Sequence, residues 1–343
     1  MEIVSSVTQV AISVAEPSQV GGARRAVRNL CEQLAFSEEQ AGKLAIIVTE
    51  AATNLAIHAK HGELLLCPSV RSDGNNSIDV MALDRGPGIS DVAQCMDDGF
   101  STAGTPGNGL GAIRRLSDKF EMFSQLGTGT VLLSRIFSSP ARMRVDANKL
   151  QAGYVCLPVK GEPVSGDTVA FRSCACGGAF MIADGLGHGI SANQASLEAG
   201  RIFVEEKSAT PAQLLDSMNH GLRATRGAAV AVASIDCEGR KVRYSGIGNI
   251  AGAIFQGEFS RSMISHNGIV GHQSPRVQEF SYEWPASGLL VMNSDGLVTN
   301  WRMNQYPGLT QKDPALIAAV LYRDFSRGRD DVAVLVVKEA DDA

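Results

Sequence analysis

One set of residues with the types and spacing to do chemistry lies in a glycine-rich stretch from Asp84 to Gly111. It contains D-R-G-P-G-I and, after a short polar insert, G-T-P-G-N-G-L-G. Glycines let a backbone turn tightly and approach a ligand closely. The last of them open a helical pattern over residues 110–119, and a helix N-terminus offers free N–H groups to an anion such as phosphate. Taken alone, the stretch also fits an ordinary loop.

A polar helix face upstream belongs with this set. A capping-box pattern at residues 37–40 starts a helix with regularly spaced apolar residues. Glu50, Asn54 and His58 lie four residues apart, so they share one face of that helix. A carboxylate and an amide there could act as general base and magnesium ligand beside a triphosphate. Asp84 could then accept a hydrogen bond from a nucleobase amine. The alternative is a solvated polar face.

The second set consists of aspartates at the ends of strand-like runs in the second half of the chain. They are Asp167, Asp184, Asp295 and Asp330. Because Asp-Gly is above all a turn signal, each aspartate alone is typical of a turn. If the strand ends meet at one edge of a sandwich, however, their oxygens gather without basic partners and favour magnesium or manganese. Two such ions could bind a phosphate and activate water for in-line attack.

Composition limits the classes of function. The 343 residues suit two domains, and 44% hydrophobic with 20% charged residues is typical of an ordinary soluble protein. A net charge of −5 without a dense basic tract argues against nucleic-acid binding. No apolar run is long enough to span a membrane, and the amino terminus lacks the pattern of a signal peptide. We therefore expect a cytoplasmic protein that binds neither nucleic acid nor membrane.

The seven cysteines are an odd number and are scattered, which argues against a disulfide framework. Cys174 and Cys176 could ligate a soft metal, but no second Cys/His pair stands at zinc-site spacing. Two cysteines alternating in a strand is the better interpretation.

The elements that must position the two sets fall into two halves. The first half is predicted to be an α/β two-layer sandwich, with helices on one face of a mixed sheet. Its predicted elements are a strand Val4–Val14, helices over 17–35 and around Glu50, a hairpin of Leu64–Val70 and Ile78–Leu83, and strands Phe120–Ser124 and Thr130–Phe137.

The second half is predicted to be an α/β/β/α sandwich on antiparallel sheets, because strand-like runs flank helical stretches at 190–207 and 211–226. A polar break follows the last strand of the first half. We place a domain at 1–137, a linker at 138–148 and a second domain at 149–340.

The motifs of the first half resemble a known family. T-E-A-A-T-N-L-A-I-H-A (residues 49–59), D-R-G-P-G, D-G-F-S-T-A-G-T-P-G-N-G-L-G and G-T-G-T resemble the N, G1, G2 and G3 boxes of the GHKL ATPases. The short insert between G1 and G2 is most similar to anti-sigma-factor serine kinases of the RsbT type. The resemblance implies Glu50 as catalytic base, Asn54 as magnesium ligand and Asp84 on the adenine. It also implies a nucleotide-binding set of Gly86, Gly88, Gly107, Gly109, Gly111 and Thr130.

The second half resembles the metal-dependent protein phosphatase 2C fold in its SpoIIE/RsbX branch. The motifs are S-G-D-T, A-D-G-L-G-H-G, S-G-I-G-N, N-S-D-G-L and R-D-D-V, between about residues 150 and 338. The resemblance implies Asp167, Asp184, the Gly185 carbonyl, Asp295 and Asp330 as metal ligands, with Asp331 as the adjacent alternative. Gly166 departs from many eukaryotic relatives, which carry a second acid there. His188 lies beside the metal loop without an assigned role.

These resemblances together imply a bifunctional regulator of bacterial partner switching and stress signalling. ATP, magnesium and manganese are the expected cofactors, and one serine of a STAS-domain antagonist protein is the expected substrate. An RsbU-like or other downstream regulator is left open as a second partner. The alternative is a phosphatase whose ATP-binding domain is a non-catalytic sensor or docking module. A scaffold with two dead sites fits poorly, because the expected ligands stand at nearly every motif.

Overall fold

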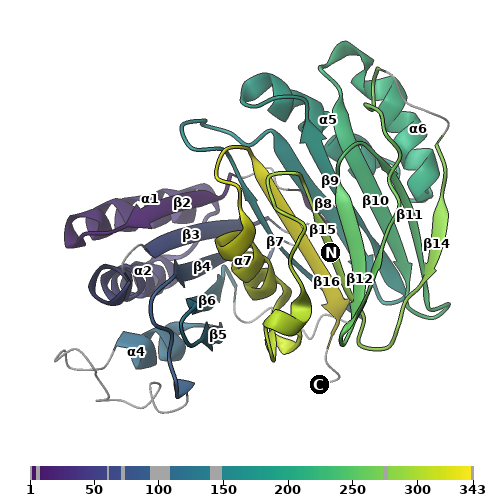
Figure 1. The fold of residues 1–343 in the computed structure, drawn as a ribbon. Helices are drawn as coiled ribbons and strands as arrows, with labels where there is room; N and C mark the ends of the chain where they lie inside the picture. Colours follow the sequence, from purple (N-terminus) through teal and green to yellow (C-terminus); the bar gives the residue numbers. More distant parts are fainter. Residues whose placement is uncertain are drawn as a thin grey trace. The chain divides into compact units, whose positions relative to one another are not determined.

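The structure, a computed structural model, describes residues 2–4, 8–59, 62–70, 74–92, 109–139, 149–272 and 277–340. Contacts divide the chain into two compact units (Figure 1). One unit contains residues 9–70 and 74–139, and the other joins the N-terminal strand β1 (Glu2–Val4) to residues 149–340. Among the described residues, no helix is both long and apolar enough to cross a membrane.

The unit of residues 9–139 is built on one five-stranded sheet. The strand order is β2 (Val10–Val14), β3 (Gly62–Ser69), β4 (Ser77–Asp84), β6 (Gly129–Phe137) and β5 (Lys119–Gln125). Every pairing is antiparallel, so the predicted mixed sheet is wrong. For β5 and β6 the reason is the short connection between them, because parallel neighbours need a long crossover.

Three helices pack on this sheet: α1 (Val20–Gln33), α2 (Glu38–His58) and α4 (Gly109–Leu116). The capping prediction at the start of α2 is confirmed, because the Ser37 side chain accepts a hydrogen bond from the backbone N–H of Gln40 at 3.3 Å. Leu44, Ile47 and Val48 on α2 are fully buried. This apolar face packs α2 on β3, β4 and β6 and thereby fixes the direction of its polar face.

The second unit is an α/β/β/α sandwich, as the sequence predicted. Helices α5 (Ile190–Glu205) and α6 (Pro211–Gly221) pack on one sheet, and α7 (Pro314–Phe325) packs on the other (Figure 1). The first sheet has the order β1, β8 (Asp167–Cys174), β9 (Gly177–Gly185), β10 (Ala228–Asp236), β11 (Lys241–Ile247) and β14 (Phe280–Glu283). The second has the order β13 (Phe259–Ser262), β12 (Ala251–Gln256), β15 (Leu289–Asn293), β16 (Val332–Glu339) and β7 (Leu150–Leu157).

The core of this unit lies between its two sheets. Phe171 and Phe180 are stacked with ring centroids 6.2 Å apart, and Tyr154 meets Phe171 edge-on at 6.1 Å. Trp284 is fully buried, and its indole N–H donates to Glu339 at 3.1 Å. A dry aromatic core of this kind holds both sheets in fixed register, so the ends of their strands have defined positions.

The N-terminal segment differs from the prediction of one strand over Val4–Val14. Strand β1 ends at Val4 and pairs with β8, placing Ile3 opposite Phe171, while the separate strand β2 pairs with β3. β1 therefore covers an edge of the six-stranded sheet that would otherwise expose unpaired backbone groups.

Candidate functional sites

The polar face of α2 meets the start of α4 in the unit of residues 9–139. A methyl group placed on Gly109 would lie 3.0 Å from Oε2 of Glu50 and 3.5 Å from both side-chain polar atoms of Asn54. The structure thus brings these three predicted residues together around one point. A carboxylate, an amide and a helix N-terminus at that point are groups that can bind magnesium and phosphate.

The D-R-G segment after β4 forms a local turn closed by a side chain. The backbone N–H of Gly86 donates to Oδ1 of Asp84 at 2.7 Å. A methyl group on Gly86 would lie 2.9 Å from that same oxygen and 3.4 Å from the carbonyl oxygen of His58. Gly86 therefore lies close to both the Asp84 carboxylate and the backbone at the end of α2.

Gly88 and Thr130 brace the loop that follows. Gly88 has a φ of +74°, and a methyl group there would collide with the Gln125 carbonyl oxygen at 2.3 Å. The Thr130 hydroxyl lies 2.8 Å from the Ser124 hydroxyl, which accepts a hydrogen bond from the N–H of Ile89 at 2.8 Å. Thr130 thus acts on the loop through Ser124.

Of two other glycines in the predicted nucleotide-binding set, the structure describes only one. Gly111 is buried in the first turns of α4. Gly107, with most of the G2 box, lies outside the described residues.

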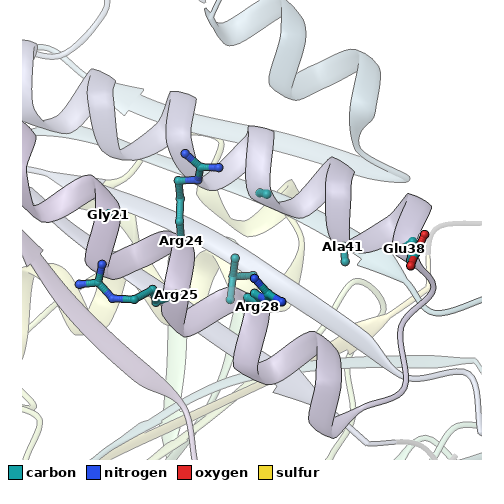
Figure 2. A pocket seen from close by; sticks show the side chains of 8 residues that line it. Gly21, Arg24, Arg25, Arg28, Glu38 and Ala41 are labelled. Atoms are coloured by element: carbon teal, nitrogen blue, oxygen red, sulfur yellow. The ribbon is translucent and has the colours of Figure 1, made fainter.

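A pocket of about 550 Å³ lies between α1 and α2 (Figure 2). None of the predicted nucleotide residues lines it. Its lining is cationic on the α1 side and includes Glu38 on α2, and consists of Gly21, Arg24, Arg25, Val27, Arg28, Glu38, Ala41 and Ala45. The pocket is therefore separate from the set around Glu50.

In the second unit, Asp167 and Asp184 are direct partners at one end of the β8–β9 pair. Asp167 is buried, and its Oδ2 accepts a hydrogen bond from the Ser294 hydroxyl at 2.6 Å. Ser294 in turn accepts from the N–H of Ala333 in β16 at 2.9 Å, so its bond to Asp167 links the two sheets. Burial and the nearby Asp184 charge raise the pKa of Asp167 well above its ordinary value.

The charges of acidic residues from the second sheet act on the carboxylate of Asp184. Burial, followed by the charges of Asp295, Asp330 and Asp331, raises the pKa of Asp184 to about 7. Burial and then Asp330 also raise the pKa of Asp295, against the opposing charge of Arg327 and a hydrogen bond from the Asn249 amide at 2.7 Å. The charges at these strand ends therefore act on one another, and the acids repel.

The two adjacent aspartates at the start of β16 have different surroundings. Asp331 is buried and accepts hydrogen bonds from the N–H of Val159 at 2.7 Å and of Gly166 at 2.8 Å. Asp330 is exposed, and its Oδ1 accepts a local hydrogen bond from the N–H of Asp331 at 3.0 Å. Asp331 therefore supports two backbone amides, whereas the carboxylate of Asp330 faces solvent.

Glycines in this site permit close backbone packing. A methyl group on Gly185 would lie 2.1 Å from the carbonyl oxygen of Ala192 in α5, and one on Gly296 would lie 2.0 Å from that of Asp331. His188, beside the metal loop, pairs its Nδ1 with Glu162 at 2.6 Å on the surface. These contacts fix the backbone on either side of Asp184 and Asp295.

The donor set suits a hard divalent cation. It consists of carboxylate oxygens whose mutual repulsion such an ion would relieve. Among the described residues, no group of three His, Cys, Asp or Glu side chains is arranged to hold one ion as it stands. The chemistry of the site therefore fits magnesium or manganese, and the ligand set of Asp167, Asp184, Gly185, Asp295 and Asp330 stays a prediction.

Two residues of this site, Ser294 and Asn249, were not assigned a role from the sequence, and Asp331 was named only as the alternative metal ligand to Asp330. Each lies inside a motif that the sequence already singled out, N-S-D-G-L, S-G-I-G-N or R-D-D-V. Their hydrogen bonds to Asp167, to Asp295 and to two backbone amides depend on contacts between distant segments. Ser294 and Asp331 each stand next to a predicted ligand, whereas no aspartate is adjacent to Asn249 to indicate its role.

Comparison with known proteins agrees with both units. A histidine kinase-like ATPase domain model matches residues 13–135, and the stage II sporulation protein E (SpoIIE) model matches residues 177–339. These matches identify a GHKL-type ATPase domain followed by a SpoIIE-type phosphatase domain.

Sequence relatives make the first assignment more specific. The serine/threonine-protein kinase RsbT of Bacillus subtilis (strain 168) is 35% identical over 108 residues, 32% of this chain and 80% of RsbT. Through this unit the chain belongs to the RsbT kinase family. An anti-sigma F factor of Caldanaerobacter subterraneus subsp. tengcongensis is 29% identical over 113 residues, 32% of this chain and 79% of that protein.

A solved structure has a similar fold over part of this chain. A chain from a study of the bacterial stressosome, described as a modular system adapted to control secondary messenger signalling, aligns with a TM-score of 0.52. It is 22% identical and covers 55% of this chain and 100% of its own length. At this identity the likeness concerns the fold alone.

Proposed function

We propose that this chain is a bifunctional regulator of a bacterial partner-switching circuit. Its RsbT-like unit phosphorylates one serine of a STAS-domain antagonist protein, and its SpoIIE-type unit removes that phosphate. The observation that supports the proposal is that one chain carries two groups of predicted site residues. Glu50 and Asn54 both lie beside Gly109 in one unit, and the charges of Asp295 and Asp330 raise the pKa of Asp184 in the other.

In the kinase unit, Glu50 takes the proton of the substrate serine as general base. Asn54, one turn further along α2, holds the magnesium ion that accompanies ATP. Asp84, oriented by the Gly86 amide, accepts a hydrogen bond from the adenine amine. Positioning and charge neutralisation account for most of the catalysis of phosphoryl transfer, and rigid packing of α2 on the sheet provides that positioning.

In the phosphatase unit, Asp167, Asp184, the Gly185 carbonyl, Asp295 and Asp330 would hold the metal ions. Bound magnesium or manganese would supply a water nucleophile at neutral pH and charge for the phosphate oxygens. Ser294 and Asn249 fix the orientation of Asp167 and Asp295 by hydrogen bonds of 2.6 and 2.7 Å. Asp331 holds the backbone before Asp167 in place.

The proposal is tested with the full-length protein, ATP, manganese or magnesium, and candidate STAS-domain proteins. Mass spectrometry then maps the phosphorylated serine and its occupancy at steady state. We expect partial phosphorylation with the unaltered protein, none with Glu50→Ala and nearly complete phosphorylation with Asp184→Ala. Asp216→Ala, on the exposed face of α6, is the matched control. Activity of the two units on different serines or different proteins would contradict the shared substrate.

A second function keeps the phosphatase and makes the ATP unit a non-catalytic sensor or docking module. It is favoured by the match to proteins named anti-sigma factors, which are defined by binding a partner. Glu50→Ala separates the two functions, because a sensor needs the nucleotide pocket but no general base. If Glu50→Ala leaves phosphorylation of the STAS protein unchanged, the kinase role fails while the phosphatase role stands.

A further inference from the structure

Two exposed cysteines face each other at the turn of the β8–β9 hairpin. Cys174 pairs with Gly177, so Ala175 and Cys176 form a two-residue turn. The sulfur atoms of Cys174 and Cys176 lie 2.9 Å apart, with one thiol donating a hydrogen bond to the other. The backbone of the turn is held from the next strand, because the Cys237 N–H donates to the Cys176 carbonyl at 3.0 Å.

The two thiols are chemically unequal. A hydrogen bond from Cys176 is the largest influence that lowers the pKa of Cys174, and backbone N–H groups of Cys176 and Gly177 add to it. The same contact raises the pKa of Cys176. Because the thiolate is the nucleophile in thiol–disulfide exchange, Cys174 is the attacking sulfur and Cys176 the resolving one.

The other described cysteines do not compete for this role. Cys31, Cys67, Cys156 and Cys237 are buried, each with at most 5% of its surface exposed. Burial raises the pKa of Cys31 to about 11 and also raises that of Cys237. Within the described part of the chain, the turn is therefore the accessible and reactive thiol site.

We propose that Cys174 and Cys176 form a redox-active dithiol that low-molecular-weight disulfides oxidise to a disulfide within the hairpin. The Cys174 thiolate attacks one sulfur of the small disulfide, breaks its S–S bond and releases one small thiolate. Cys176 then loses its proton and attacks the Cys174 sulfur of the mixed disulfide, which releases the second small thiolate. Both released thiolates take up the protons that the two cysteines lost, so two protein thiols and one small disulfide become one protein disulfide and two small thiols.

The geometry requires little movement for this reaction. The sulfurs need to approach from 2.9 Å to the covalent separation of about 2.05 Å. The site lies at the opposite end of the hairpin from Asp167 and Asp184, so it is distinct from the carboxylate set. The proposal is independent of the proposed kinase and phosphatase activities.

The test uses the reduced full-length protein with an excess of oxidised glutathione, followed by intact-mass measurement. We expect the unaltered protein to lose two hydrogen atoms, and peptide mapping should show Cys174 and Cys176 protected from alkylation. Cys176→Ser should accumulate one glutathione adduct on Cys174, because the resolving thiol is missing. Cys174→Ser should form no disulfide within the hairpin, because the attacking thiol is missing. Cys237→Ser, at a buried thiol, is the control and should oxidise as the unaltered protein does.

Two outcomes would overturn the proposal. These are an unchanged mass of the unaltered protein, or stable glutathione adducts on both of its turn cysteines. Both are read on the unaltered chain, so they do not depend on how the variants fold.

Discussion

Gly166 donates its backbone N–H to Oδ2 of Asp331 over 2.8 Å, which ties the residue before Asp167 to the start of β16. A methyl group on Gly166 would lie 2.7 Å from that same oxygen and 3.0 Å from Cβ of Ala192. An acidic side chain at position 166 would therefore conflict with the position of the Asp331 carboxylate. A side chain there would have to displace the carboxylate that supports the loop.

Asp330 and Asp331 should respond in opposite ways to removal. Asp331→Ala leaves two backbone N–H groups without their acceptor and should lower the free energy of unfolding by on the order of 3 kcal/mol. Asp330→Ala, at an exposed side chain, should change it by less than about 0.5 kcal/mol while weakening manganese binding. Denaturant unfolding and calorimetric manganese titration measure the two effects. Manganese affinity lost only in Asp331→Ala would assign the ligand role to Asp331.

Gly166→Ala should destabilise the protein by about 1–3 kcal/mol, because the added methyl group overpacks a closed site. Gly42→Ala is a matched control on α2, where a methyl group would meet nothing within 4 Å. In a helix interior this change should stabilise by about 0.5–1 kcal/mol. Thermal and denaturant unfolding compare the two variants. If Gly166→Ala leaves the free energy of unfolding unchanged, the loop that contains Asp331 moves easily to accept the methyl group.

Asn54→Ala should weaken magnesium-ATP binding by at least about tenfold, or 1.4 kcal/mol, since it removes the amide that lies beside Gly109 and Glu50. Asn29→Ala, an exposed position on α1, serves as the control and should bind as before. Calorimetry of the full-length protein with ATP and magnesium provides the measurement. Equal affinity in both variants would remove Asn54 from the nucleotide site.

Manganese should stabilise the protein more at neutral than at acid pH. The pKa of Asp184 is raised to about 7, so without metal the folded state keeps a proton that the unfolded state loses at lower pH. The metal-free protein therefore loses stability as the pH rises from about 4 to about 7. A bound cation favours the charged carboxylate and reverses this loss.

Thermal unfolding with and without manganese, at about pH 5 and about pH 7.5, checks this sign. Asp184→Asn should abolish most of the difference between the manganese-induced increases in Tm at the two pH values. A manganese-induced increase in Tm that is equal at both pH values would contradict the coupling.

The sequence predicted the elements whose pattern is local. Helix α2 has both a capping residue and regular apolar spacing, and the aspartates of the second unit stand at the ends of recognisable strands. Helix α7 was missed because nine of its twelve residues are buried, so it lacks the polar face that identifies an amphipathic helix. The links from Ser294 to Asp167 and from Asn249 to Asp295 join distant segments, and no local pattern encodes such pairs.

Because strand β1 belongs to the second unit, the RsbT-like unit is inserted in the sequence between two segments of that unit. The phosphatase sheet begins with residues 2–4 and resumes only after residue 148, so both ends of the kinase unit are anchored to the same neighbour. A fragment that starts at residue 149 lacks β1 and leaves the outer side of β8 without its natural hydrogen-bond partner. An exposed strand edge of this kind can pair with a strand of another chain. Truncated phosphatase should therefore be prone to self-association, and a peptide of the first few residues should suppress that association in trans.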